Sequence, residues 1–299
     1  MAARLNTASE YEALLDKYDT WMFDCDGVLW SGDRLIDGAV DVLSLLRQRK
    51  KQIIFVTNNA TKSRKTLKRN FDKLGVEAHL NEIYGSAYAA AVYISSVVKL
   101  PKDKKVYVIG MEGIEQELRE EGIEFIGGTD SADCTLESFS LADFTLDPAV
   151  GAVLCGGDTA INYTKLSKAY QYLTRSPGCL FLITNEDSTY PTQHGVLPGS
   201  GAISAGLRYA LGRDPLAIGK PARTMLDCIR AKVQYDPKRT IMVGDRLNTD
   251  ILFGKNGGLA TLLVLSGITS ESDISGANAS PIVPDYVTGS IGDLRILKA

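Results

Sequence analysis

The sequence is poor in residues on which several common kinds of site depend. Among its 299 residues there are only two histidines, so a histidine-rich metal site or a serine–histidine–aspartate triad has little to draw on. The five cysteines are scattered and form no C-x-x-C pair, which argues against a disulfide framework and against a zinc site. A reducing compartment therefore fits the chain best.

Long apolar runs and clusters of one charge are missing as well. The longest apolar stretch, around residues 259–265, is far shorter than the ~18 residues of a membrane span. The N-terminal segment lacks the apolar core of a signal peptide. Lysine and arginine total 33 against 36 aspartate and glutamate, with only short basic patches, which argues against a nucleic-acid partner. We expect a cytoplasmic protein that binds neither a membrane nor nucleic acid.

Several short apolar runs end abruptly in a polar residue. Short runs without alternation are typical of strands buried on both faces, as in a parallel sheet. Residues at helical spacing lie between them, for example Leu67, Phe71 and Leu74. Alternating strands and helices predict an α/β fold with a doubly wound parallel sheet, whose ligands bind beyond the carboxyl ends of the strands. The runs cover residues 21–23, 53–56, 217–218 and 240–243.

The middle of the chain predicts a second, smaller domain. A length of 299 residues exceeds one typical domain. Residues 104–205 contain strand candidates of their own, and they separate the second apolar run from the third. We therefore predict a core built from residues 1–103 and 206–299, with residues 104–205 inserted into it. FVTNN at 55–59 and LITNED at 182–187 look alike, although strand-to-turn chemistry alone could produce both.

Two carboxylates follow the first apolar run. Alternation along the strand points Asp24 and Asp26 the same way. One carboxylate can attack phosphorus, while the other protonates the leaving oxygen and later activates water. Taken alone, the motif could equally be a strand that ends in a turn. A calcium loop is excluded, because Val28 and Leu29 stand where it needs an oxygen ligand and a glycine.

Two neighbouring carboxylates that face an anionic substrate need a cation nearby. At ~4 Å, like charges repel by about 1 kcal/mol in water and by about 4 kcal/mol at an effective dielectric of ~20. Lys220, between a glycine and a proline, can supply the charge, although a lone lysine is more often a solvated surface residue. Asp24 and Asp245 would offer oxygen ligands that suit Mg²⁺. Asp250 could orient a metal-bound water or simply open the next helix.

A further polar segment follows the second apolar run. Thr57, Asn58 and Asn59 offer a hydroxyl and two amides, which suit a dianionic phosphate, although such a tripeptide alone is more often a turn. If the strands are neighbours, all these side chains converge on one crevice.

These segments resemble the motifs of a known family. DCDGVLW, FVTNNAT, AIGKP and VGDRLNTD, in that order, resemble the four motifs of haloacid dehalogenase-type phosphatases. The insert is similar to the type-two α/β cap of the subgroup that holds eukaryotic phosphoglycolate phosphatase, 4-nitrophenylphosphatase and pyridoxal phosphate phosphatase. The resemblance spans nearly the whole chain.

The resemblance implies roles for the residues that match these motifs. It implies a cap that closes over the substrate, and a homodimer formed through the caps. It also implies Asp24 as nucleophile, Asp26 as acid and base, Thr57, Asn58 and Lys220 as phosphate ligands, and Asp24, the Asp26 carbonyl and Asp245 as magnesium ligands.

Other functions stay open at this point. Phosphoglycolate is the first expected substrate, by resemblance, and pyridoxal phosphate the second. A phosphotransferase would use the same residues. A receiver-type signalling domain also places Asp, Thr and Lys at strand ends, but it has no use for Asp26 and leaves the rest of the chain unexplained. A purely structural or binding protein leaves the polar strand ends without a role. His194, in a loop of the insert, could touch substrate, although a surface-loop histidine is the more frequent case.

Overall fold

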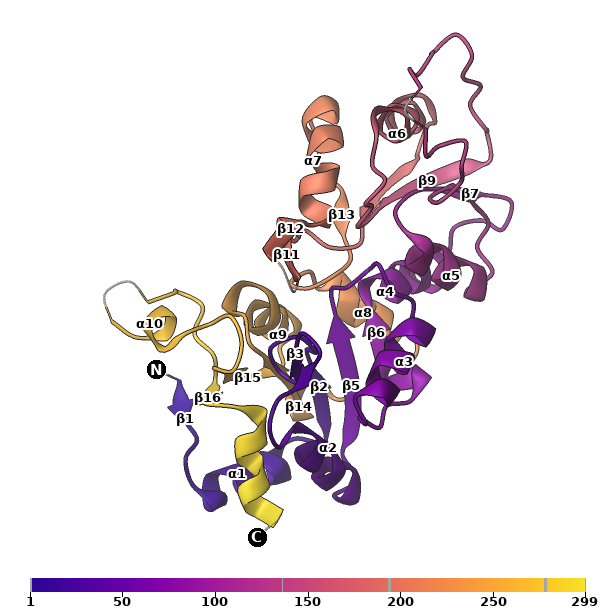
Figure 1. The fold of residues 1–299 in the computed structure, drawn as a ribbon. Helices are drawn as coiled ribbons and strands as arrows, with labels where there is room; N and C mark the ends of the chain where they lie inside the picture. The colour runs from indigo at the N-terminus through magenta and orange to yellow at the C-terminus, as the bar shows by residue number, and fades with distance from the viewer. Residues whose placement is uncertain (1, 136, 193–194, 277–278, 299) are drawn as a thin grey trace.

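A seven-stranded parallel sheet forms the lower part of the molecule in Figure 1, in the order β1-β16-β15-β14-β2-β5-β6. The computed structural model describes residues 2–135, 137–192, 195–276 and 279–298. His194 lies outside the described residues. The strands are β1 (Ala3–Arg4), β2 (Thr20–Phe23), β5 (Gln52–Thr57), β6 (Ile83–Gly85), β14 (Thr240–Gly244), β15 (Ala260–Val264) and β16 (Tyr286–Thr288).

Both faces of this sheet are buried, which explains why its strands read as unbroken apolar runs. Trp21 and Phe23 of β2 point into one hydrophobic cluster, and Met22 between them points into another. The first cluster lies against α1 (Ala8–Lys17), α2 (Ala39–Gln48), α3 (Arg64–Lys73) and the C-terminal 3₁₀ helix Ile291–Lys298; the second lies against α4 (Ser86–Val92), α8 (Thr224–Arg230) and α9 (Leu252–Gly257). The predicted doubly wound α/β core is confirmed.

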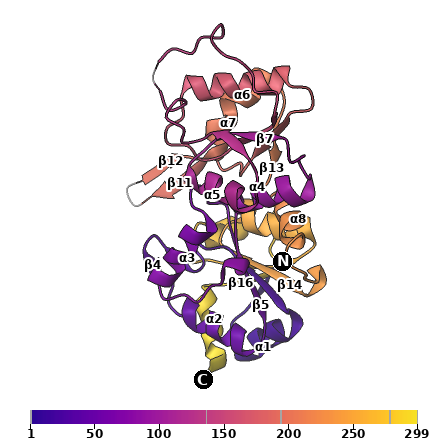
Figure 2. The same ribbon diagram turned by 90° about the vertical axis from the view of Figure 1, so that its right-hand side faces the viewer.

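The inserted segment forms a second parallel sheet, in the order β13-β10-β9-β7-β8. One face packs against α6 and α7, and the other packs toward α4 and α5 in the same cluster that covers the core sheet. Figure 2 shows α4, α5 and α8 at the level where the two sheets meet. The elements are β7 (Lys105–Ile109), α5 (Glu112–Glu120), β8 (Phe125–Gly127), β9 (Val150–Cys155), α6 (Tyr163–Arg175), β10 (Leu180–Ile183), α7 (Ser200–Leu211) and β13 (Leu216–Ala217).

The remaining elements are short. Two antiparallel pairs stand outside the sheets, β3 with β4 and β11 with β12. No helix in the described part of the chain combines the length and the apolar character needed to cross a bilayer. The bounds are β3 (Trp30–Ser31), β4 (Arg34–Leu35), β11 (Thr189–Thr192), β12 (Gly195–Pro198), α10 (Glu271–Ile274), the 3₁₀ turns Leu80–Glu82 and Pro237–Arg239, and the π-helical turns Tyr93–Val97 and Leu247–Ile251.

Two expectations about the end of the insert need correction. The run at 217–218 was expected to be a core strand, but Leu216 and Ala217 pair with Leu182 and Ile183 of the second sheet. The expected boundary at residue 205 falls inside α7, which packs on that same sheet. Only two residues pair in β13, too few for the sequence to show which sheet they join. The strands that pair in the second sheet thus run from Lys105 to Ala217.

The insert packs closely against the loop that follows β5. Gly113, at the start of α5, lies against the backbone of Thr61 and Lys62, where a Cβ atom would come within 2.6 Å of the Thr61 carbonyl carbon. In the same helix the Glu117 carboxylate, 1% exposed, accepts hydrogen bonds from the backbone and the Nε of Arg64 at the start of α3. Apolar packing and a buried ion pair thus hold the two parts of the molecule together.

Candidate active site

Asp24 lies at the carboxyl end of β2, where the sheet register brings three strand ends level. Its backbone N–H donates to the Val243 carbonyl at 2.9 Å, which places it beside the end of β14. On the other side, Phe23 pairs with Phe55, so Thr57 at the end of β5 lies close by. The predicted convergence of Asp24, Thr57 and Asp245 on one edge of the sheet is what parallel pairing produces.

Lys220 reaches this edge from the opposite direction, out of the segment that returns from the insert. Its side chain is 2% exposed, and its Nζ donates to Asp24 Oδ1 at 2.6 Å, to Asp250 Oδ1 at 2.7 Å and to the Val56 carbonyl at 2.7 Å. Burial alone would lower the pKa of Lys220, but the carboxylates of Asp24 and Asp250 outweigh it and raise that pKa above its ordinary value. The ammonium is therefore a fixed positive charge within the site.

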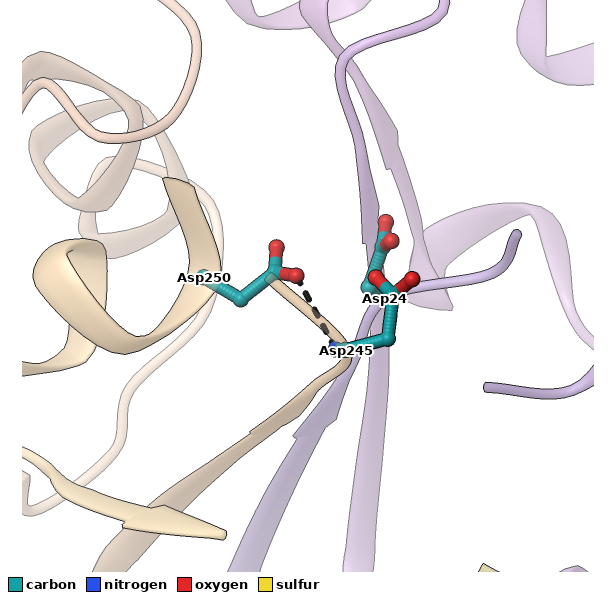
Figure 3. Close-up of side chains that lie close together, drawn as sticks. All are labelled: Asp24, Asp245 and Asp250. Atoms are coloured by element: carbon teal, nitrogen blue, oxygen red, sulfur yellow. Dashed lines mark hydrogen bonds between the residues drawn. The ribbon is translucent and has the colours of Figure 1, made fainter. Parts of the chain in front are cut away.

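Three carboxylates surround this position. Asp24, Asp245 and Asp250 each offer an oxygen atom, and these atoms lie within 4.8 Å of one another. Figure 3 shows Asp24 and Asp245 at the ends of neighbouring strands, with Asp250 reaching toward them from the segment after β14. Burial raises the pKa of Asp24 well above its usual value and, with the nearby Asp250, raises the pKa of Asp245 to about 6. Both carboxyl groups thus favour the neutral form unless a further cation lies beside them.

Asp250 already has partners for both of its oxygen atoms. Oδ1 accepts from Lys220, and Oδ2 accepts from the backbone N–H groups of Asp245 at 3.2 Å and of Arg246 at 3.1 Å, the first of which is the dashed line in Figure 3. These bonds suit a residue that orients its neighbours rather than one that coordinates an ion directly.

Asp245 has one oxygen atom without a partner. Its Oδ2 accepts from the Ile268 backbone N–H at 2.7 Å, whereas Oδ1 is buried and bonds to no group in the described residues. Two glycines make room around this carboxylate, because a Cβ atom on Gly27 or on Gly267 would collide with Asp245 Oδ2. Gly27 also has a φ of +80°, which side chains rarely tolerate. A buried carboxylate oxygen in excess of its hydrogen bonds, beside Asp24, fits a hard divalent cation such as Mg²⁺.

Asp26 lies on the exposed side of the same turn. Its Oδ1 accepts a hydrogen bond from the indole Nε1 of Trp30 at 3.0 Å, and the Trp30 ring packs edge-on against Phe71 at 4.9 Å between centroids. The buried ring therefore restrains the Asp26 carboxylate, while the residue itself remains exposed.

The three residues of the predicted phosphate-binding segment differ in how many of their polar atoms are already hydrogen-bonded within the protein. Thr57 is 4% exposed and accepts at Oγ1 from the Asn59 backbone N–H at 3.2 Å, which leaves its hydroxyl proton available. Asn59 uses Oδ1 to accept from both the N–H and the hydroxyl of Thr61. The Asn58 amide, expected to bind phosphate, instead bonds to Lys220 and to Asp187.

Asp187 and Asn185 also contact the site, although no sequence motif predicted them. LITNED at 182–187 resembles FVTNN at 55–59, and the structure brings the two segments together. Asn185 Nδ2 donates to the Asn58 carbonyl at 2.8 Å. The likeness between the segments was the available signal, but it could not show that the two turns face each other.

The fold and the site together define a hydrolase class. The chain matches the family described as haloacid dehalogenase-like hydrolase over residues 21–124 and the one described as HAD-hydrolase-like over residues 217–294. It belongs to the haloacid dehalogenase-like hydrolases, and it is a phosphatase that acts on phosphomonoesters. The signalling-receiver and purely structural alternatives are thereby set aside.

Particular relatives are similar along nearly their whole length. The chain is 50% identical to the 4-nitrophenylphosphatase of Schizosaccharomyces pombe, with 98% of this chain and 99% of that protein covered. It is 43% identical to phosphoglycolate phosphatase 2 of Arabidopsis thaliana, with 98% of each covered. Among solved structures, the p-nitrophenyl phosphatase from Archaeoglobus fulgidus superposes with a TM-score of 0.78 at 29% identity, over 93% of this chain and 98% of that one.

Binding of magnesium should be visible as a gain in stability. We expect saturating Mg²⁺ to raise the Tm of the protein by several degrees, because a ligand at about 100 times its Kd stabilises the folded state by about 2.7 kcal/mol. Asp245→Asn should abolish that rise, since it removes the unpaired carboxylate oxygen. Asp72→Asn, which changes an exposed carboxylate on α3, should keep it. An equal rise in the Asp245 variant, measured by calorimetry, would place the ion elsewhere.

Proposed function

We propose that the protein is a Mg²⁺-dependent phosphomonoesterase that forms a phospho-aspartate on Asp24. The observation that carries the proposal is the position of the Asp24 carboxylate, which is buried at a strand end, held by Lys220 at 2.6 Å and close to Asp245, a carboxylate with one unpaired oxygen. This arrangement combines a nucleophile, a fixed cation for the phosphoryl oxygens and an acidic pair able to hold a metal.

Each residue then has a defined task. Asp24 attacks phosphorus, while Lys220 and the Thr57 hydroxyl stabilise the phosphoryl oxygens. Asp26, restrained by Trp30, protonates the leaving oxygen and then takes a proton from the water that hydrolyses the acyl phosphate. Asp24, Asp245 and the Asp26 carbonyl would hold Mg²⁺, which supplies charge neutralisation when bound. Asp250 keeps Lys220 and the turn at Asp245 in place.

The proposed substrate is a small phosphorylated metabolite of the phosphoglycolate kind, with nitrophenyl phosphate as a second substrate. The names of the relatives from Arabidopsis thaliana and Schizosaccharomyces pombe support this choice. Pyridoxal phosphate and transfer to an acceptor other than water are the alternatives. Release of free phosphate without an added acceptor distinguishes hydrolysis from transfer.

The proposal predicts that Asp24→Asn lowers phosphate release from phosphoglycolate and from 4-nitrophenyl phosphate by at least about 10³-fold, since the attacking oxygen is neutralised. Chelation of divalent metal should have a comparable effect, reversed by added Mg²⁺. Asp16→Asn, an exposed change on α1, should leave the rate unaltered. A colorimetric phosphate assay measures all three. Retained turnover in Asp24→Asn would move the chemistry to another residue.

We also propose a cytoplasmic homodimer formed through the insert. Exposed apolar side chains on β12, α7 and the edge strand β13 support an interface there, among them Leu197 at 47%, Tyr209 at 93% and Leu216 at 40% exposure. Burying such side chains is favourable. Sedimentation at micromolar concentration should give the mass of a dimer, and a monomer would contradict the proposal.

A further inference from the structure

The side-chain amide of Asn58 holds the backbone of Lys220 on both sides. Asn58 Oδ1 accepts from the Lys220 N–H at 2.8 Å, and Asn58 Nδ2 donates to the Lys220 carbonyl at 2.9 Å. The amide therefore pairs with one residue in the manner of a neighbouring strand. Gly219 permits this approach, because a Cβ atom there would lie 2.6 Å from Asn58 Oδ1. The catalytic lysine is thus fixed by a residue of the core, 162 positions earlier in the sequence.

The second hydrogen of the same amide is used by the insert. Asn58 Nδ2 donates to Asp187 Oδ2 at 3.1 Å, so both amide hydrogens and the amide oxygen have partners. No hydrogen of this amide is left for a phosphate oxygen. The bond to Asp187 matters because it fixes which way the amide faces. If the Asn58 amide rotated by 180°, its Nδ2 would face the Lys220 N–H and its Oδ1 would face the Lys220 carbonyl.

The backbone of Asp187 is held by other residues of the insert. Its backbone N–H donates to Asn185 Oδ1 at 3.1 Å, and its carbonyl accepts from the Gly201 N–H at the start of α7 at 3.0 Å. The neighbouring Asn185 donates to the Asn58 carbonyl, and Gly219 N–H donates to the Thr184 carbonyl at 2.7 Å. The end of β10 therefore contacts both the turn at Asn58 and the segment at Gly219. The relative position of these two segments sets how far the Lys220 side chain must extend to meet Asp24.

From these contacts we infer that Asp187 and Asn58 are positioning residues for Lys220, through which the seating of the insert sets the distance between the ammonium and Asp24. The inference deepens the proposed function and rests on it. The carboxylate of Asp187 fixes the orientation of the Asn58 amide, and the amide fixes the Lys220 backbone. Lys220 then spans from that point to Asp24 and Asp250. The amide of Asn58 is, on this account, not a phosphate ligand.

The inference makes a specific demand on mutant kinetics. Asp187→Ala should lower kcat for 4-nitrophenyl phosphate by about tenfold, the worth of about one hydrogen bond, with KM changed less than about twofold. Asp187→Asn keeps an acceptor oxygen and should recover to within about threefold of the wild type. Glu186→Ala removes the adjacent carboxylate, which is exposed and faces Arg208 within the insert, and should leave kcat unchanged.

A double-mutant cycle with Asn58→Ala separates positioning from direct contact with substrate. If Asp187 acts only through Asn58, Asp187→Ala should cost less than about twofold further in kcat once Asn58 is alanine. A full tenfold further loss, a change in KM alone, or an unchanged kcat in Asp187→Ala would each overturn the inference. Should Asn58→Ala not fold, as judged by its melting curve, the comparison of Asp187→Ala with Asp187→Asn still decides. Wild-type phosphate release, measured in parallel, reports on the proposed function separately.

Discussion

The buried ammonium of Lys220 between Asp24 and Asp250 is the interaction on which the rest of the site depends. A charge with 2% exposure is tolerable only if oppositely charged and hydrogen-bonding groups surround it. Two carboxylates and the Val56 carbonyl do so, and they come from three separate segments of chain. The same contacts hold Asp24, the proposed nucleophile, and occupy one oxygen atom of Asp250. One electrostatic requirement therefore accounts for most of the geometry around the phosphoryl position.

The insert contributes contacts to the site in addition to packing against the core. One hydrophobic cluster runs from the core sheet through α4 to the second sheet, and the Arg64–Glu117 ion pair joins α3 to α5. At the site itself, Asp187 and Asn185 bond to Asn58. The same contacts thus fix the position of the insert on the core and the position of Lys220. The family resemblance implies that the insert moves. Such a movement would have to break these bonds, or else Asn58 would have to move together with the insert.

The sequence predicted the parts of the site that strand ends determine. Asp24, Thr57 and Asp245 follow buried runs, and parallel pairing necessarily brings such ends to one edge. The double burial of β2 is visible as an unbroken apolar run. Lys220 was expected to follow a core strand, but the strand before it belongs to the second sheet, because two paired residues do not show in the sequence which sheet they join. The direction of the Asn58 amide and the contact with Asp187 depend on tertiary packing between distant turns, which no local pattern reports.

In the proposed mechanism, Asp24 carries the phosphoryl group during turnover. Rapid acid quench of the enzyme with excess substrate, followed by peptide mass spectrometry, tests it most directly. We expect one phosphoryl group on the peptide that contains Asp24, labile to hydroxylamine as an acyl phosphate is. A phosphoryl group on another residue, or steady turnover with no modified peptide at any quench time, would contradict it.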